Sequence, residues 1–232
     1  MQPLAIVTDI EGTTSSIGFV KEVLFPYAAR NLPGFIRANL ESRDVMRQLH
    51  SISEYTGIAI SDTDELILQL LQWIRDDKKI TELKALQGLV WERGYQQGEY
   101  QAHIYDDVPG KLREWFDLGI NLYVYSSGSE KAQRLFFRYS DAGDLRLLFA
   151  GYFDTIFGPK QDKASYSNIA DAIALPAERI LFLSDIPEEL DAARAAGFRT
   201  TLLVRPKDSP LDPHKLKTSH PVARNFNEVV IE

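Results

Sequence analysis

Short apolar runs alternate with helix-forming stretches between residues 106 and 204, and this alternation constrains the fold more than any other feature of the chain. Strands are expected at 120–125, 153–157, 180–184 and 200–204, and helices at 109–118, 130–139, 164–175 and 187–196. Strands that alternate with helices of about 10–15 residues are typical of βαβ units, whose parallel strands form one sheet covered by helices. The sequence therefore predicts an α/β protein with right-handed crossovers.

One more strand is expected near the N-terminus, and a long helical region separates it from the others. Residues 4–7 form an apolar run of the kind found in buried parallel strands. From residue 17 to residue 104 the pattern is helical, with helices expected at 43–55, 62–74 and 81–93. A segment as short as residues 1–16 cannot form a domain by itself. We therefore predict a Rossmann-like core, made of 1–16 and 105–232, with an all-helical cap, 17–104, inserted after the first strand.

Polar side chains follow four of the expected strands. They are Asp9 and Glu11 after the first strand, Ser126 and Ser127 after the second, Lys160 after the third, and Asp185 after the fourth. Because the carboxyl ends of parallel strands meet at one edge of a sheet, we expect these side chains to converge there. Each of them alone would more often be a helix cap or a solvated surface residue, so it is their convergence that predicts a site.

The acidic residues at this edge suit phosphoryl transfer. Asp9 and Asp185 offer carboxylate oxygens, which are the ligands that Mg²⁺ prefers. With its charge neutralised by the ion, Asp9 can attack phosphorus as a nucleophile. Glu11 lies two residues further along an extended segment and so points the same way as Asp9, where it can protonate the leaving oxygen and later activate a water.

The remaining residues suit the phosphate itself. The Ser126 hydroxyl and the N–H groups of Ser127 and Gly128 stand at the start of an expected helix, which favours anions. Lys160 adds a positive charge that can stabilise both Asp9 and the group in transfer. The sequence thus predicts a magnesium-dependent phosphotransferase site.

The composition argues against several other classes of protein. The 232 residues carry 26 Lys and Arg against 33 Asp and Glu, a formal net charge of −7, which disfavours non-specific nucleic-acid binding. Without cysteine, the chain has neither disulfides nor thiolate metal sites. No apolar run approaches the roughly 18 residues of a membrane span, and no signal-peptide pattern is present. We expect a cytoplasmic protein with no membrane or nucleic-acid partner, and a monomer, since no long apolar surface helix stands out.

These residues and their spacing resemble the haloacid dehalogenase superfamily of phosphotransferases that use an aspartate nucleophile. The stretch Asp9-Ile10-Glu11-Gly12-Thr13-Thr14 is similar to the narrower family of enolase-phosphatases of methionine salvage, also called acireductone synthases. In that family a glutamate, here Glu11, replaces the aspartate that is usual in the superfamily. Further matching stretches lie at 19–28, 86–92, 94–95, 98–99, 125–129 and 181–185.

The resemblance implies a haloacid dehalogenase-type core with a helical cap and one Mg²⁺ per chain. Asp9, Glu11 and Asp185 would surround the metal, Glu11 through its main chain or its carboxylate. Ser126, Ser127 and Lys160 would contact the substrate. Lys163 is the alternative to Lys160, which we prefer because it directly follows Gly158-Pro159, as the family's spacing requires.

The resemblance also implies a bifunctional reaction. A small phosphorylated diketone, 2,3-diketo-5-methylthiopentyl 1-phosphate, would be enolised and then dephosphorylated to the acireductone 1,2-dihydroxy-3-keto-5-methylthiopentene. The alternative is a general magnesium-dependent phosphomonoesterase of the same superfamily, which would share the core residues and differ in the cap. A binding module that has lost catalysis is disfavoured, because Asp9, Glu11, Lys160 and Asp185 are all present.

Three residues of the expected cap keep two interpretations each. Lys21 is more simply a solvated helical lysine than a substrate contact. Trp91 and Tyr95 are more simply cap core than a wall of the substrate site.

Overall fold

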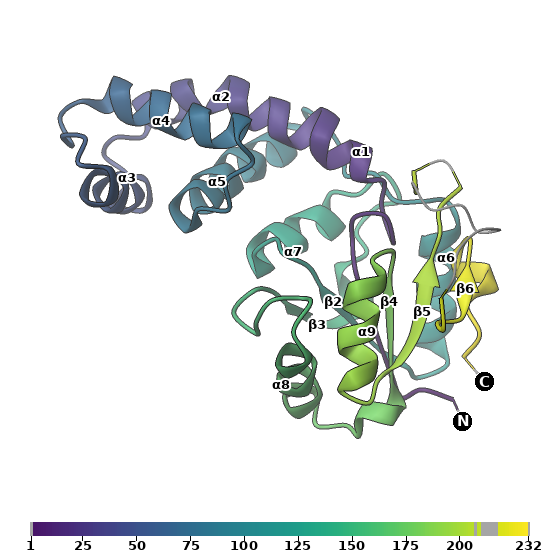
Figure 1. The fold of residues 1–232 in the computed structure, drawn as a ribbon. Helices are drawn as coiled ribbons and strands as arrows, with labels where there is room; N and C mark the ends of the chain where they lie inside the picture. Colours follow the sequence, from purple (N-terminus) through teal and green to yellow (C-terminus); the bar gives the residue numbers. More distant parts are fainter. Residues whose placement is uncertain (1, 207, 210–217, 232) are drawn as a thin grey trace. The chain divides into compact units, whose positions relative to one another are not determined.

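The computed structural model describes residues 2–206, 208–209 and 218–231. Within these residues six parallel strands form one sheet in the order β3-β2-β1-β4-β5-β6 (Figure 1). The strands are β1 (Ala5–Thr8), β2 (Asn121–Tyr125), β3 (Phe149–Phe153), β4 (Ile180–Ser184), β5 (Arg199–Leu203) and β6 (Val222–Ala223). The α/β class predicted from the alternation of strands and helices is confirmed.

β1 lies in the middle of this sheet. Every residue of β1 is buried, as expected for an apolar strand covered on both faces. Its residue Ala5 stands beside Asn121 of β2 on one side and Ile180 of β4 on the other. The carboxyl ends of these three strands therefore lie next to each other at one edge of the sheet.

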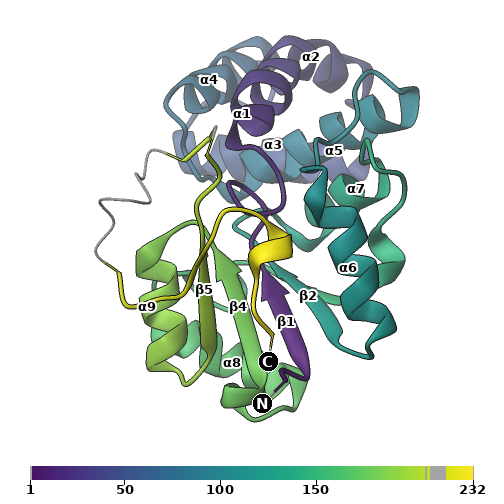
Figure 2. The same cartoon turned by 90° about the vertical axis from the view of Figure 1, so that its right-hand side faces the viewer.

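In the described part of the chain, four helices cover the two faces of the sheet. α8 (Lys163–Ile173) and α9 (Pro187–Ala195) lie on one face, and α6 (Asp107–Asp117) and α7 (Glu130–Arg138) lie on the other (Figure 2). Under α8 and α9 the sheet contributes alternate apolar residues to a buried cluster, which includes Ala5, Val7, Tyr166, Ile169, Phe182 and Leu190. This packing fixes the strand ends that carry the candidate site.

By contacts between residues, the chain divides into two compact units, Met1–Phe19 with Gln101–Glu232, and Val20–Tyr100. The sequence predicts a core of 1–16 and 105–232 and a cap of 17–104. That the two units act as catalytic core and cap stays a prediction.

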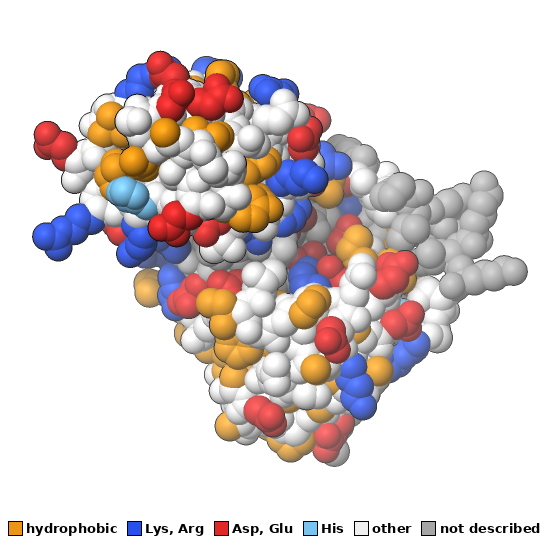
Figure 3. Space-filling view, turned by 60° about the vertical axis from the view of Figure 1, so that its left-hand side comes forward, with side chains coloured by type: hydrophobic (Ala, Val, Ile, Leu, Met, Phe, Trp, Pro, Cys, Tyr) orange, Lys and Arg blue, Asp and Glu red, His pale blue; other side chains and the backbone are white. Residues whose placement is uncertain are grey.

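On the face shown in Figure 3, acidic and basic side chains are interspersed, so the charge there is mixed in sign.

The second unit is helical throughout. A π-helical turn (Val20–Leu24) leads into four helices, α2 (Phe25–Ala38), α3 (Arg43–Thr56), α4 (Thr63–Arg75) and α5 (Thr81–Gln97). Each helix buries one apolar face in a shared core, formed by residues such as Leu32, Ile36, Leu49, Ile52, Leu66, Leu70, Leu83 and Leu86. Asp62 accepts the N–H of Glu65 (3.2 Å) at the start of α4, as the capping spacing predicts.

Two residues interpreted as possible substrate walls, Trp91 and Tyr95, belong to α5. Tyr95 is buried, and the Trp91 ring stacks on Phe25 and donates to the Leu24 carbonyl (2.9 Å).

α5 also runs past Gly94, where the sequence predicts its end, and stops at Gly98, whose φ is +70°. Gly94 serves packing instead, because a Cβ there would lie 2.8 Å from the Tyr27 ring.

The strand predicted at 153–157 is misplaced. β3 ends at Phe153, and the following residues form a loop in which Asp154 accepts the N–H groups of Glu130 and Ile156. Phe149 and Gly151 supply the pairing with β2 instead, although Gly151 weakens the apolar pattern of this strand.

Among the described residues no helix combines the length and the apolar character that crossing a bilayer requires.

Arg205, in the loop after β5, is a buried cation that ties distant segments of the first unit together. Its guanidinium donates to the Thr13 carbonyl (2.6 and 3.0 Å) and to both carboxylate oxygens of Asp107 (2.8 and 2.9 Å). The same carboxylate accepts the N–H of Phe226 (2.7 Å), and the guanidinium lies over the Tyr105 ring at 4.1 Å. The turn after β1, the start of α6 and the C-terminal segment are thus joined at one point.

Replacing Arg205 with Met should lower the free energy of unfolding by about 3 kcal/mol, because breaking a buried ion pair leaves the partner charge uncompensated. Asp107 would then be largely buried beside an apolar side chain without its guanidinium partner. Urea unfolding measures the difference. Arg224→Met, an exposed position in the same unit, is the control and should change stability by no more than about 0.5 kcal/mol. Equal stability of the two variants would contradict this role of Arg205.

Candidate active site

β1 delivers Asp9 to the carboxyl edge of the sheet. The Asp9 N–H donates to the Leu183 carbonyl (2.9 Å), so pairing with β4 continues one residue past the strand, and Asp9 is buried. The chain then turns, with the Gly12 N–H donating to the Ser15 carbonyl (2.7 Å). The turn keeps Glu11 close to Asp9. Burial, and secondly the charge of Asp9, raise the pKa of Glu11, while Lys160 opposes this effect.

Gly12 lets the end of β4 approach this turn. Its φ is +75°, and a Cβ at this position would lie 2.2 Å from Oδ2 of Asp185, the residue that follows β4. The Asp185 carboxylate therefore packs against the glycine. Burial raises the pKa of Asp185 to about 7, and the charges of Asp9 and Glu189 add to the effect. Its Oδ1 atom is buried and has no hydrogen-bond partner within the described part of the chain.

Lys160 is the cation at the centre of the site. Its ammonium group donates to Oδ1 of Asp9 (2.5 Å) and lies 2.8 Å from Oε2 of Glu189. Asp9 and Glu189 are buried, and the Lys160 side chain is 11% exposed. Burial favours the neutral amine, but the two carboxylates outweigh it and raise the pKa of Lys160 above its ordinary value. The lysine therefore stays protonated beside Asp9. Lys163, the alternative, lies exposed in the first turn of α8.

β2 delivers the serines. The Ser126 hydroxyl lies 3.5 Å from Oε2 of Glu11, at the outer limit of a hydrogen bond, and accepts the N–H of Gly128 (3.2 Å). Ser126 is buried, whereas Ser127 is exposed at the start of the turn that leads to α7. The structure thus joins Ser126 to the acidic cluster and places Ser127 next to it on the surface.

The donor set suits a hard divalent cation. The described residues contain no group of three acidic, histidine or cysteine side chains arranged to hold a metal by themselves. Magnesium, however, is commonly bound by one or two carboxylates together with waters and substrate phosphate. Asp9 and Asp185 fit this pattern, and the unpartnered Oδ1 of Asp185 is the kind of atom that a cation would satisfy.

Comparison with known proteins gives the site its context. The family model of haloacid dehalogenase-like hydrolases matches residues 4–197. The chain is 53% identical over 228 residues to the Enolase-phosphatase E1 of Pseudomonas aeruginosa (strain LESB58), covering 98% of both chains. It is 52% identical to the Enolase-phosphatase E1 of Alcanivorax borkumensis, covering 97% of both. The crystal structure of UTR4 protein from Saccharomyces cerevisiae superposes with a TM-score of 0.82 at 34% identity, covering 98% of this chain and all of that one.

The chain belongs to the enolase-phosphatase family of the haloacid dehalogenase-like hydrolases. The resemblance inferred from the motif at residues 9–14 is therefore confirmed.

In this enzyme Glu189 completes the site, although no motif in the sequence predicts it. It comes from the first turn of α9, four residues after Asp185, and accepts hydrogen bonds from the Ser184 hydroxyl (2.9 Å) and from Lys160. Burial, and then the charge of Asp9, raise the pKa of Glu189 to about 7, against the opposing effect of Lys160. The only signal available was its place one helical turn from Asp185 on a helix that starts at Pro187.

The enolase-phosphatase site can supply a nucleophile and a proton donor for a phosphoryl transfer. Asp9 presents a carboxylate whose Oδ1 is engaged by Lys160, so the other oxygen is available to attack phosphorus. Glu11, whose raised pKa favours the protonated state, is suited to donate a proton. The Ser126 hydroxyl, at the outer limit of its bond to Glu11, offers a hydrogen-bond group for a phosphate oxygen, whereas the Gly128 N–H already donates to Ser126.

Replacing Gly12 with Ala should move the Asp185 carboxylate and lower the free energy of unfolding, because the new methyl group would overlap Oδ2. Gly119→Ala is a matched control: its φ of +77° imposes the same backbone strain, but nothing lies within 4 Å of a Cβ there. Gly119→Ala should cost about 1 kcal/mol and Gly12→Ala about 1–3 kcal/mol more. Thermal unfolding measures both, and equal losses would show that Asp185 does not press on Gly12.

Proposed function

We propose that this chain is a bifunctional enolase-phosphatase, an acireductone synthase of methionine salvage. It converts 2,3-diketo-5-methylthiopentyl 1-phosphate into 1,2-dihydroxy-3-keto-5-methylthiopentene and phosphate. The observation that carries the phosphatase step is the 2.5 Å contact of Lys160 with Asp9, at the strand edge that also holds Asp185 and Glu11. The enolase step rests on the near full-length similarity to relatives named Enolase-phosphatase E1.

Phosphate transfer would proceed in two displacements. In the first, an Asp9 oxygen attacks phosphorus, the bond to the substrate oxygen breaks, and Glu11 gives that leaving oxygen its proton. In the second, Glu11 takes a proton from a water, the water oxygen attacks phosphorus, and phosphate leaves as the Asp9 carboxylate re-forms. Lys160 stabilises the charge that develops on the transferred group.

One Mg²⁺ per chain is part of this proposal. The Asp9 and Asp185 carboxylates would hold it, with Glu11 contributing its main chain or its carboxylate. When bound, the ion neutralises charge between the carboxylates and the phosphate and acts as a Lewis acid toward substrate oxygens. The orphaned Oδ1 of Asp185 supports this assignment. Ser126, Ser127 and Lys160 would bind the substrate, and the chain would act as a monomer with residues 17–104 as its cap.

Incubation of the protein with the diketone phosphate and Mg²⁺ should release phosphate and also produce the ultraviolet absorbance of the enediol product. Excess chelator should stop both signals and excess Mg²⁺ should restore both, because the carboxylates need the ion to accept a phosphate beside them. Phosphate release without the absorbance would support the general phosphomonoesterase instead. An undiminished rate in chelator would contradict the metal site.

Asp9→Asn should reduce phosphate release at least about 10³-fold, because the amide is not nucleophilic and carries no charge for the metal. The same change at Asp162, an exposed residue that caps α8 through its side chain, is the control and should leave the rate unchanged. Circular dichroism and thermal unfolding would establish that both variants fold. Substantial turnover by a folded Asp9→Asn variant would remove Asp9 from the role of nucleophile.

A further inference from the structure

Three consecutive carbonyl groups in the loop that carries Lys160 each accept a hydrogen bond from a side-chain hydroxyl. Tyr125 donates to Gly158 (2.9 Å), Ser165 to Pro159 (2.7 Å) and Tyr166 to Lys160 (2.6 Å). These carbonyls follow β3 and precede α8, where the chain makes no sheet ladder. Each carbonyl of the segment Gly158–Lys160 is therefore held by a separate hydroxyl group.

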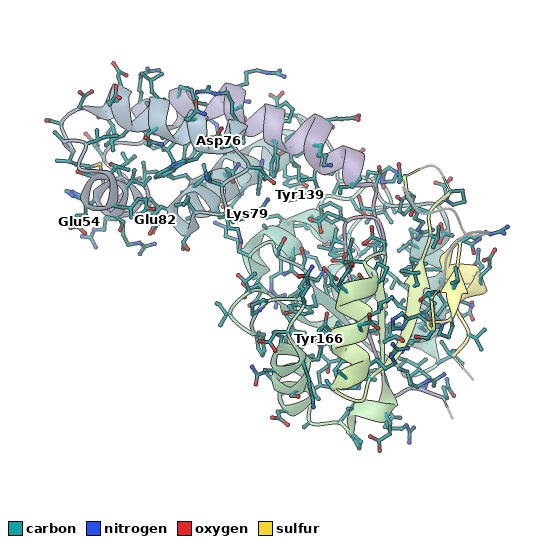
Figure 4. All side chains as sticks on the ribbon, in the orientation of Figure 1. Glu54, Asp76, Lys79, Glu82, Tyr139 and Tyr166 are labelled. Carbon is teal, nitrogen blue, oxygen red and sulfur yellow. The ribbon has the colours of Figure 1, made fainter. Side chains whose placement is uncertain are left out.

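The donors stand on rigid parts of the fold. Tyr125 is the last residue of β2, and Ser165 and Tyr166 belong to the first turn of α8. Figure 4 labels Tyr166. All three residues are buried, and the Tyr166 ring packs edge-on against Tyr125 and Phe182. Neither tyrosine ring is free to turn its hydroxyl elsewhere without breaking this packing.

Gly158 makes the arrangement possible. Its φ is +124°, and a Cβ at this position would lie 2.2 Å from the Ser165 hydroxyl oxygen. The glycine therefore admits the α8 hydroxyl close to the loop backbone. The backbone conformation of the loop thus depends on a glycine at position 158, and only a glycine leaves room for the Ser165 hydroxyl.

Lys160 has a reason to need such support. Its long side chain is flexible, yet its ammonium group must stay within hydrogen-bond distance of both Asp9 and Glu189. The ammonium also lies 5.8 Å from the centre of the Tyr125 ring, which limits its movement on that side. A shift of the Lys160 backbone would carry the ammonium away from the nucleophile, and reaction rates depend steeply on such placement.

We propose that Tyr125, Ser165 and Tyr166 are positioning residues for Lys160, whose hydroxyl groups hold the Gly158–Lys160 backbone so that the ammonium group stays paired with Asp9. This inference rests on the proposed phosphatase function. The three hydroxyls do not touch the substrate. They act on the reaction through the lysine alone.

The test is the steady-state kinetics of Tyr166→Phe, Tyr125→Phe and Ser165→Ala on the diketone phosphate. Each change removes one hydroxyl and keeps the side-chain shape. Each should lower kcat about 10-fold to 100-fold, the effect of a misplacement of roughly 1 Å, and leave KM within about twofold. The loss falls on kcat because the ammonium is paired with the attacking carboxylate.

Tyr152→Phe is the matched control. Tyr152 is another buried tyrosine of the same unit, but its hydroxyl has no hydrogen-bond partner among the described residues. Its removal should change neither kcat nor KM. Thermal unfolding of all variants, with assays run well below each midpoint, separates positioning from a general loss of structure.

The proposal also sets an upper limit on the loss of kcat when all three hydroxyl groups are removed. Because the three hydroxyls act through one lysine, the triple variant should lose no more kcat than Lys160→Met. Kinetics of Tyr166→Phe equal to those of Tyr152→Phe, a loss confined to KM, or a triple variant slower than Lys160→Met would overturn the inference. An inactive wild-type protein would instead overturn the proposed function, so the two failures are distinguishable.

Discussion

The ammonium group of Lys160, held between Asp9 and Glu189, is the interaction on which the rest of the site depends. It joins Asp9, at the end of β1, to Glu189, in the first turn of α9, through side chains that are largely buried. At such a place a lone carboxylate would become protonated, whereas a carboxylate beside a fixed cation can stay charged and nucleophilic. The parallel sheet makes this contact possible, because the loops that follow β1 and β3 leave the same edge of the sheet, and residues 151 positions apart in the chain meet there.

One lysine does not balance the acidic groups that surround it. Four carboxylates, those of Asp9, Glu11, Asp185 and Glu189, act on each other here, and the pKa of the last three is raised by burial together with the charge of Asp9. The protein therefore concentrates negative charge where an anionic phosphate would have to bind. A divalent cation between Asp9 and Asp185 reverses that sign, which is the physical reason for expecting magnesium in this arrangement.

The loops that carry these groups are held by buried polar contacts rather than by the sheet. Arg205 fixes the turn after β1 through the Thr13 carbonyl, and three hydroxyl groups fix the loop of Lys160. Both devices satisfy backbone carbonyls that have left the strand ladder, where an unpaired group would be costly. Loops supported in this way can keep a reactive side chain in place while remaining irregular in conformation.

The sequence was sufficient for the parts that follow from local pattern, and insufficient where tertiary contact decides. β1, β2 and β4 end where the apolar runs end, so Asp9, Ser126 and Asp185 could be placed at one edge from the alternation alone. β3 was misplaced because the run at 153–157 contains aromatic residues while the true strand includes Gly151. Arg205 carried no local signal and Glu189 carried only its place four residues after Asp185, since nothing local marks a charged residue as buried. Their roles follow from partners distant in the chain, Arg205 from a carbonyl 192 residues away and Glu189 from a lysine on another loop. A motif read along the sequence can therefore find the groups that react, whereas the groups that hold them in place are defined only by the fold.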